Sequence, residues 1–401
     1  MPKRQTTNQL TMSKQMLFFS GCLLLVVGFI LGTRSATIGT VLAPFVGIKT
    51  SSKSIDLSSI EQTYKRLVAN YDGKLDTQKL IDGANHGLVS AAGDKFTVYL
   101  TSSEASELSK DLSGDVGAGI GAEITSRNGW PVISKLLPDN PAETAGLRAD
   151  DVIFSVNSES AKGWSADKAA AKIRGKAGTT LRLVVQRMGK NKSFDLTRAV
   201  INNPSVTSEV KNGVGIMTIS RFDDQTGVLA RKAAQELAAQ HVKGIVLDLR
   251  GDGGGYIDAA IDVASLWLDD GQLVVSQREH GKTIHKSYAT GDPLLGKIKT
   301  IVLVDGNTAS ASEIVSAALR DNHKATLLGE TTYGKGSVQQ ILNLDGGAEL
   351  KVTVAHWYTP KNINVGEKGL TPNTTVKMTA RDINTGKDPQ LKAALGQLGV
   401  K

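Results

Sequence analysis

A serine at position 310 has the surroundings that a nucleophile needs. It lies in Asn307–Glu313, between the apolar run TIVLVD, which predicts a buried strand, and a stretch that predicts a helix over 310–320. A serine at such a turn exposes its hydroxyl, while the next backbone N–H and the helix N-terminus favour developing negative charge. Ser310 and Glu313 also have the S-x-x-E spacing of a helix capping box, which needs no catalysis. The segment alone favours the cap, and the two roles are compatible.

A serine nucleophile needs a base, and Lys335 is the candidate that the sequence offers. It stands between two glycines, just ahead of an apolar strand. A lysine acts as a base only when it is neutral, so its pKa must fall from about 10.4, and a fall of about three units costs about 4 kcal/mol. Gln339 lies four residues further on, where it would face the same side as Lys335 and hold the amine. Taken alone, such a lysine is more often a solvated loop residue.

A glycine-rich loop follows a second buried strand. The strand GIVLDLR is followed by Gly251-Asp252-Gly253-Gly254-Gly255. Consecutive glycines let a backbone approach a substrate closely and aim several N–H groups at one point, which suits an oxyanion. A tight turn before the next helix explains the glycines equally well.

The segments around these residues alternate between strand and helix patterns from Val214 onward. Helices are expected over 227–240 and 257–268, between continuous Val, Ile and Leu runs. That order predicts a largely parallel α/β layer covered on both faces. Ligands of such sheets bind where strands end, which is where Ser310 and the glycine loop lie.

Two smaller units precede this layer. Apolar residues recur at three- and four-residue spacing within 60–67 and 79–92, which predicts a small helical unit. From Gly117 the pattern changes to short alternating runs bounded by Gly and Pro, which predicts a small barrel of strands with one or two helices.

Composition excludes several classes of partner and site. The formal charge is +8 and the pI is about 9.3, but Lys and Arg are scattered among acidic residues, so we expect no nucleic-acid partner. The six histidines form no HExxH-type pair, so no metal site is expected. The single cysteine, Cys22, leaves neither a disulfide within the chain nor a thiol nucleophile.

A basic segment and an apolar run open the sequence. Lys3, Arg4 and Lys14 precede the run 16–32, whose length is near the lower limit for a spanning helix. No clean A-x-A cleavage site closes the run, so we expect an uncleaved, single-pass anchor in the cell membrane, with the catalytic domains outside the cytoplasm. A cleaved export signal and a lipoprotein box at Cys22 are the weaker interpretations.

Four motifs, in one order, resemble the C-terminal processing peptidases, also called tail-specific proteases. They are DLRGDGGG, NTASASEIVSAAL, GETTYGKGSVQQ and a late GLTPN, and the likeness covers most of residues 60–375, including AAGDKFTVYL. The resemblance implies an α/β, crotonase-like serine protease core. It also implies a Ser/Lys dyad with a supporting glutamine, at Ser310, Lys335 and Gln339.

The resemblance further implies that backbone amides hold the oxyanion. They correspond here to Gly254, Gly255 and Ala311. The chain departs from the family's usual Asn-x-Gly-Gly form, because it has Asp252 followed by three glycines. The match therefore does not decide which glycine donates.

The motifs GIGAEI, NPAETAGLRADDVI and KIRGKAGT resemble a PDZ domain. That likeness implies a groove that adds an extended peptide as a strand and holds its terminal carboxylate in a backbone nest. The matching loop residues are Gly119, Ile120, Gly121 and Ala122. Arg174, at the end of the PDZ helix, is a candidate for signalling occupancy of the groove to the dyad.

We therefore predict an α/β multidomain serine endopeptidase that cleaves proteins at or near their C-terminal tails and needs no metal or other cofactor. Its expected partners are protein substrates with nonpolar C-terminal tails and the membrane, and the sequence leaves a homo-oligomer open. The rival interpretation is a non-catalytic PDZ scaffold of the cell envelope, in which Ser310 is only a cap. A thioester-handling enzyme of the crotonase type would need acidic catalytic residues and an adenine-nucleotide site, and neither signature is found.

These predictions divide the chain into seven segments. The expected bounds are 1–15 for a basic tail, 16–32 for the anchor, 33–56 for a linker, 57–113 for the helical unit, 114–190 for the PDZ domain, 191–380 for the protease core and 381–401 for a C-terminal tail.

Overall fold

The computed structural model describes residues 56–379, 381–382 and 385–400. The chain forms two compact parts, one through Thr77 and one from Gln78. The described portion of the first part holds α3 (Ser58–Asn70), which has no buried residue. Within the described ranges, no helix is both long enough and apolar enough to cross a membrane. The anchor expected at 16–32 lies outside those ranges.

The second part begins within α4 (Thr77–Ser90), after its first residue, and continues with β1 (Val98–Leu100) and α5 (Ser102–Ser113). α5 starts at a capping box in which the Glu104 carboxylate accepts the N–H of Thr101 at 2.8 Å. It ends at Gly114, whose φ of 68° is the left-handed conformation common at helix C-termini. These helices lie in the segment where the sequence predicts a helical unit.

A small unit built on a six-stranded antiparallel sheet follows. The sheet contains β3 (Ala122–Arg127), β4 (Trp130–Leu136), β5 (Val152–Val156), β6 (Glu159–Ser160), β7 (Thr180–Arg187) and β8 (Lys190–Thr197). The unit also holds the paired strands β2 (Ala118–Gly119) and β9 (Ala199–Val200) and the helices α6 (Pro141–Thr144) and α7 (Ala166–Ile173). On β7, Leu181, Leu183 and Val185 are buried and the residues between them are not, as expected of a strand with one face in a core.

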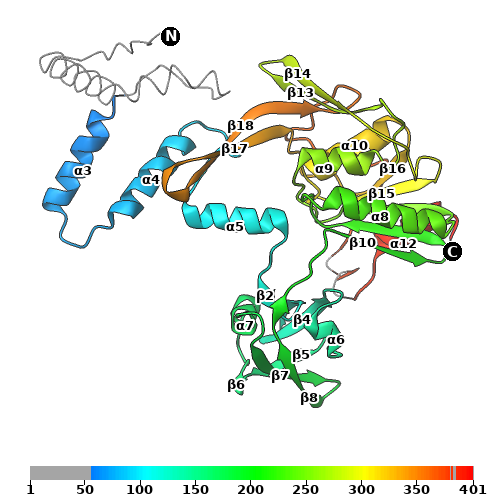
Figure 1. Ribbon diagram of the computed structural model, residues 1–401, viewed down its shortest axis with the longest axis horizontal. Coiled ribbons are helices and arrows are strands. Elements are labelled where there is room, and N and C mark those ends of the chain that lie inside the picture. The colour runs from blue at the N-terminus through cyan, green and yellow to red at the C-terminus, as the bar shows by residue number, and fades with distance from the viewer. Residues whose placement is uncertain (1–55, 380, 383–384, 401) are drawn as a thin grey trace, which may run out of the picture. The chain divides into compact units, whose positions relative to one another are not determined.

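The larger unit is a second six-stranded sheet, in the order β10-β11-β12-β15-β16-β19. Its strands are β10 (Val206–Lys211), β11 (Val214–Ile219), β12 (Gly244–Asp248), β15 (Thr300–Val304), β16 (Ala325–Gly329) and β19 (Thr374–Thr375). The helices around it are α8 (Thr226–Ala239), α9 (Ile257–Ala264), α10 (Ala311–Asp321) and α12 (Pro389–Gln397) (Figure 1). From β11 to β19 each pairing is parallel, and β10 joins antiparallel at the edge. The predicted α/β layer is confirmed.

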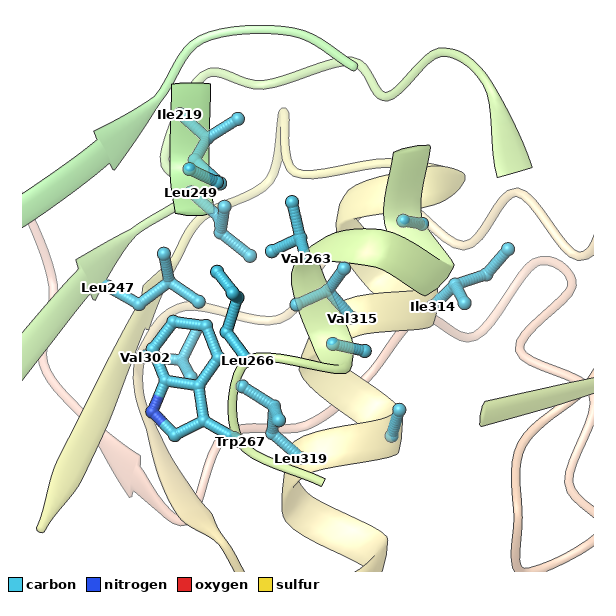
Figure 2. Packing of buried hydrophobic residues seen from close by; sticks show 14 of the residues in the cluster. Ile219, Leu247, Leu249, Val263, Leu266, Trp267, Val302, Ile314, Val315 and Leu319 are labelled. Atoms are coloured by element: carbon cyan, nitrogen blue, oxygen red, sulfur yellow. The ribbon is translucent and has the colours of Figure 1, made fainter. Parts of the chain in front are cut away.

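This sheet carries a hydrophobic core on each face, because successive strand residues point to opposite sides. From β12, Ile245 and Leu247 join the cluster formed with α8, α9 and α10, whereas Val246 joins the cluster formed with α12. Figure 2 shows Leu247 and Trp267 within the first cluster. Trp267 is fully buried and donates its Nε1–H to Thr300 Oγ1 at 2.9 Å, so its polar group is satisfied.

An antiparallel sheet carries the segment after Lys335. Its order is β1-β18-β13-β14, and β17 pairs with β18. The strands that complete it are β13 (Leu273–Glu279), β14 (Lys282–Tyr288), β17 (Ser337–Asn343) and β18 (Glu349–Tyr358), with the short 3₁₀ helix η2 (Asp345–Gly347) between the last two. Because β1 pairs with β18 from Val98 opposite Lys351, the loop before β1 is brought to the strands that follow Lys335.

The last segment differs from the polar peripheral tail that composition suggests for 381–401. α12 starts at Asp388, whose carboxylate accepts the N–H of Leu391 at 2.8 Å, and Ala394 is fully buried against the core sheet. Arg250, just after β12, pairs with Asp388 at 2.9 Å. A helix can pack against a core through a single apolar stripe. When that stripe includes a small residue such as Ala394, the average hydrophobicity of the segment stays low and does not reveal the stripe.

Candidate active site

Ser310 lies at the turn between β15 and α10, as predicted, and its backbone is strained. It occupies the N-cap of α10 with φ 57° and ψ −116°. Non-glycine residues rarely adopt a positive φ, and such strain is concentrated at functional sites. The turn is held by Thr308, whose Oγ1 donates to the carbonyl of Leu249 at 2.8 Å and whose carbonyl accepts the N–H of Tyr333 at 3.0 Å. α10 is almost entirely buried, so the packing of a whole helix maintains the strain.

The serine turn and the lysine loop meet at Glu313, whose side chain is fully buried. Its Oε2 accepts the N–H of Ser310 at 2.9 Å, which is the glutamate half of the expected capping box. The same oxygen accepts the N–H of Lys335 at 2.9 Å. Oε1 accepts the Thr332 hydroxyl at 2.5 Å and the N–H of Gly334 at 2.9 Å. Four donors therefore satisfy this buried carboxylate and join the two segments through it.

The glycines on either side of Lys335 are required by close backbone packing. Gly334 has a φ of 86°, and a Cβ there would lie 2.7 Å from the nitrogen of Gly369. At Gly336 a Cβ would lie 2.6 Å from the nitrogen of Gly366. Any side chain at either position would push the loop away from its support. The loop is therefore a packed element and not a solvated turn.

The Lys335 side chain is half-buried and meets an aromatic ring, with Nζ 5.7 Å from the centroid of Phe96. Burial lowers the pKa of Lys335, the charge of Lys351 lowers it further, and Glu313 acts in the opposite direction. Desolvation and a like charge both favour the neutral amine, which is the form that a base requires. Among the described residues, Nζ has no hydrogen bond to Ser310 Oγ, so the two groups are not engaged in this arrangement.

Gln339 lies on β17, and its amide nitrogen is already used. Nε2 donates to Ser337 Oγ at 2.8 Å and to Thr353 Oγ1 at 3.2 Å. The amide oxygen has no hydrogen-bond partner in the described part of the chain, and none joins Gln339 to Lys335 there. The same-face argument from spacing needs correction, because β17 begins only at Ser337 and a register irregularity between Val338 and Gln339 interrupts the alternation.

The glycine loop packs against the serine turn. A Cβ at Gly254 would lie 2.8 Å from both the nitrogen of Ala311 and Cβ of Ser310, so only glycine fits. The N–H of Gly254 donates to Asp252 Oδ1 at 2.8 Å, so this expected oxyanion donor is occupied by an internal acceptor. The N–H groups of Gly255 and Ala311 have no hydrogen-bond partner among residues that the structure describes. Of the three expected donors, those two remain free for a ligand.

Asp252, at the position where the resembled family has asparagine, is a fully buried acid. Burial raises its pKa to about 7, although the Gly254 N–H, Ser312 and the charge of Arg221 act to lower it. Its Oδ2 has no hydrogen-bond partner within the described ranges. Near neutral pH this carboxyl therefore exchanges between its acid and its anion beside the glycine loop.

The residues predicted to bind a peptide line a groove on the smaller unit. The groove has a volume of about 380 Å³, and its lining includes Gly119, Ile120, Gly121, Ala122 and Arg174. β3 is an edge strand of its sheet, and Ala170 and Ile173 of α7 line the same groove. An unpaired strand edge facing apolar side chains of a helix is the geometry that accepts an added strand. The structure thus brings the predicted peptide-binding residues and Arg174 together.

Sequence reasoning assigned no chemistry to three further residues near Lys335 and Gln339, namely Asp94, Phe96 and Thr353. The first two lie in AAGDKFTVYL, within the likeness noted above, but they were expected to belong to a separate helical unit. The pairing of β1 with β18 brings them to the site. The one available signal was an acidic and an aromatic residue inside a motif shared with peptidases.

Comparison with known families and proteins agrees with this geometry. The family model described as Peptidase family S41 matches residues 213–376, which contain Ser310 and Lys335. The model described as PDZ domain matches residues 108–186, which contain all the groove-lining residues named above.

Individual proteins show the same likeness along most of the chain. A protein of Staphylococcus haemolyticus named "Probable CtpA-like serine protease" is 33% identical over 356 residues, covering 86% of this chain and 71% of that protein. A protein of Staphylococcus aureus with the same name is 34% identical over 358 residues, covering 87% and 72%. A solved Bacteroides fragilis structure assigned to the S41 proteases covers 88% of this chain and 98% of its own, with 17% identity and a TM-score of 0.59, which is a likeness of fold.

Proposed function

Since the chain belongs to peptidase family S41 and is a serine peptidase with a PDZ domain, we propose that Ser310 is its nucleophile and Lys335 its general base. One observation carries this assignment. The strained turn that presents Ser310 and the loop that presents Lys335 are both held by the Glu313 carboxylate. The Glu313 carboxylate therefore binds both a serine at a helix N-terminus and a lysine whose pKa is lowered by burial, which is the pairing that an activated serine nucleophile needs.

The proposed reaction begins with proton transfer. The neutral Lys335 amine takes the Ser310 Oγ proton while Oγ attacks the carbonyl carbon of the scissile peptide bond. The carbonyl oxygen becomes negative, and the free N–H groups of Gly255 and Ala311 are the proposed donors to it. The Lys335 ammonium then gives its proton to the leaving amine nitrogen as the C–N bond breaks, which leaves an ester on Ser310.

Hydrolysis of the ester follows the same path with water. Lys335, neutral again, removes a proton from a water molecule as the water oxygen attacks the ester carbonyl carbon. The ester C–O bond breaks, Ser310 Oγ regains a proton from the ammonium, and the new carboxylic acid leaves. One lysine therefore serves as base and acid in both halves of the reaction, and no cofactor is required.

Engagement of the dyad requires the Lys335 amine to approach Ser310 Oγ. Catalytic hydrogen bonds are often long without substrate and tighten when it binds. The flexible stem of lysine permits this movement, whereas the backbone of Lys335 is held by Glu313. In this proposal, substrate binding brings the amine into contact with the serine.

The groove of the PDZ domain is the proposed site for the nonpolar C-terminal tail of a protein substrate. The free edge of β3 would pair with the tail, and the backbone at Gly119, Ile120, Gly121 and Ala122 would hold the terminal carboxylate. Arg174 ends α7 and lines the groove, so it is the proposed link between occupancy of the groove and the dyad. Cleavage would then occur at or near the tail that the groove has bound.

The proposal assigns the chain to the cell membrane, with the catalytic domains outside the cytoplasm. Its support is the basic Lys3, Arg4 and Lys14 ahead of the apolar run 16–32, the order that retains the basic side in the cytoplasm. The proposed catalytic groups all come from one chain, so the chemistry needs no homo-oligomer.

The test is Ser310→Ala in the full chain, with an unstructured polypeptide that ends in an apolar tail as substrate and mass spectrometry of the products as readout. We expect no cleavage above background, unchanged circular dichroism, and full activity in Ser208→Ala, an exposed serine on β10. Cleavage by Ser310→Ala at the parental rate would remove Ser310 from the mechanism. Absence of cleavage in the parental protein, with retained binding of the tail, would instead favour the PDZ scaffold.

A further inference from the structure

A chain of hydrogen bonds reaches Gln339 from the loop that precedes β1. Asp94 Oδ2 accepts the Thr353 hydroxyl at 2.5 Å, and Thr353 Oγ1 accepts Nε2 of Gln339 at 3.2 Å. Asp94 Oδ2 also accepts the Thr97 hydroxyl at 2.7 Å, and Thr97 Oγ1 accepts the N–H of Thr353 at 3.0 Å. Asp94, Thr97 and Thr353 thus form one connected group across the β1–β18 pairing.

Asp94 is ionised within this group. Burial alone would raise its pKa, but hydrogen bonds from Thr353, Thr97 and the Phe96 N–H, together with the charge of His356, leave the pKa of Asp94 lowered. An ionised carboxylate accepts hydrogen bonds and cannot donate one. The direction of each bond to Asp94 is therefore decided by its charge.

That direction passes along the chain to Gln339. A hydroxyl has one proton, and Thr353 must give its proton to Asp94, so Thr353 Oγ1 is left as an acceptor toward Gln339. The group that faces Thr353 must then be the amide nitrogen, whose second hydrogen goes to Ser337 Oγ at 2.8 Å. The amide oxygen points elsewhere and has no partner among the described residues. The charge on Asp94 thereby selects one of two otherwise similar orientations of the Gln339 amide.

The orientation matters for a lysine base. The amine of Lys335 needs its lone pair for the Ser310 proton and can donate its hydrogens to an acceptor. An amide oxygen accepts one of those hydrogens and stabilises the ammonium that forms in each half-reaction. A flipped amide would present N–H groups instead, which would compete for the lone pair and repel the ammonium.

We propose that Asp94 and Thr353 are positioning residues that hold the Gln339 amide with its oxygen available to the Lys335 amine. This inference rests on the proposed function, because it assumes that Lys335 is the base. It extends the catalytic unit to the loop between α4 and β1. That loop also supplies Phe96, whose ring centroid is 5.7 Å from Lys335 Nζ.

The matched pair Thr353→Val and Thr353→Ser, in the full chain, tests the role of the hydroxyl. Valine keeps the shape and removes the hydroxyl, whereas serine keeps the hydroxyl. We expect Thr353→Val to lower kcat about tenfold with little change in KM, within the range for residues of one hydrogen-bond network. The acidic limb of the kcat profile, which reports the enzyme with substrate bound, should move to lower pH because the ammonium loses an acceptor, and Thr353→Ser should restore both. Thr283→Val, on the exposed strand β14 of the same sheet, should change neither.

A double-mutant cycle with Gln339→Ala separates positioning from a general loss of packing. If Thr353 acts through Gln339, adding Thr353→Val to Gln339→Ala should cause no further loss of kcat. Additive losses, or parental kcat in Thr353→Val, would overturn the inference. Should Thr353→Val fail to give the parental circular dichroism spectrum, Asp94→Asn takes its place in the cycle with the same expected outcomes.

A separate variant, Lys335→Met, tests the proposed function itself. Full activity in Lys335→Met removes the lysine base, and the inference falls with it. Loss of activity in Lys335→Met, with parental kinetics in Thr353→Val and Asp94→Asn, removes only the inference.

Discussion

The backbone N–H groups of Ser310 and Lys335 donate to the same atom, Oε2 of Glu313, at 2.9 Å each. A single buried carboxylate oxygen therefore sets the separation between the segment that presents the nucleophile and the segment that presents the base. The helix cap and the nucleophile are one structure, because the Glu313 that caps α10 also receives the lysine loop. The glutamate of a local helix cap thus also binds the Lys335 loop, which is not part of that cap.

Glu313→Gln should damage both the fold of the site and the dyad. A glutamine keeps one oxygen and turns the other into an NH₂ group, which faces N–H or hydroxyl donors and leaves them unsatisfied at a cost of about 1–3 kcal/mol. Loss of the negative charge also removes the influence that raises the pKa of Lys335, so the acidic limb of kcat/KM should move to lower pH. Thermal unfolding and pH–rate profiles check both effects against Glu236→Gln, an exposed glutamate on α8. Parental Tm and kcat in Glu313→Gln would contradict the shared support.

Lys351→Gln should move the same limb in the opposite direction. The Lys351 charge helps to lower the pKa of Lys335, so removing it raises that pKa. The neutral amine is then reached only at higher pH, and the acidic limb shifts upward. Lys286→Gln, an exposed lysine on β14, is the control and should leave the limb unmoved. A limb that stays in place in Lys351→Gln would mean that it does not report Lys335.

Two neighbouring glycines should respond differently to the same substitution. In Gly254→Ala the new Cβ would lie 2.6 Å from the carbonyl oxygen of Ala309 and 2.8 Å from the nitrogen of Ala311, at a φ of 96°. The loop must move away from the serine turn, so we expect loss of peptide cleavage. In Gly253→Ala the Cβ meets no atom within 4 Å, so activity should be close to parental. Equal rates for the two variants would show that the close approach at Gly254 is not needed.

Asp252→Asn tests the buried acid through the pH dependence of stability. The folded-state pKa is raised to about 7, so between about pH 4 and pH 7 the folded protein holds a proton that the unfolded chain releases. Stability from this group is therefore present at low pH and lost as the pH rises through 7, by up to about 4 kcal/mol. Asparagine does not titrate. The unfolding free energy of Asp252→Asn, measured relative to that of the parental protein, should therefore be higher at pH 8 than at pH 5. A difference that is the same at both pH values would contradict the raised pKa.

Much of the fold could be predicted because its signals are local. A short apolar run predicts the buried strand around Val302, and a capping box ahead of a longer stretch predicts the helix after Ser310. Both elements are found where they were predicted. α12 was missed because its apolar stripe includes a small residue such as Ala394. Short amphipathic helices with such stripes do not stand out from a polar segment.

The candidate site could be predicted only in part, for a different reason. Ser310 and Lys335 carry recognisable local patterns, but the partners that hold them come from segments far apart in the chain. Asp94 reaches Thr353 only through the pairing of β1 with β18, and no spacing rule connects residues so far apart. The occupied N–H of Gly254 was likewise hidden, because it depends on the conformation of the loop after Asp252.

The role of Lys335 as the base for Ser310 is tested by the rate of peptide-bond hydrolysis in full-length Lys335→Met. Methionine keeps an unbranched apolar stem against Phe96 but cannot take a proton, and Lys286→Met serves as the matched control. If Lys335 is the base, kcat should fall by about 10²–10⁴-fold, the usual contribution of a general base, with an unchanged fold and full activity in the control. Hydrolysis at the parental rate by Lys335→Met would contradict that role.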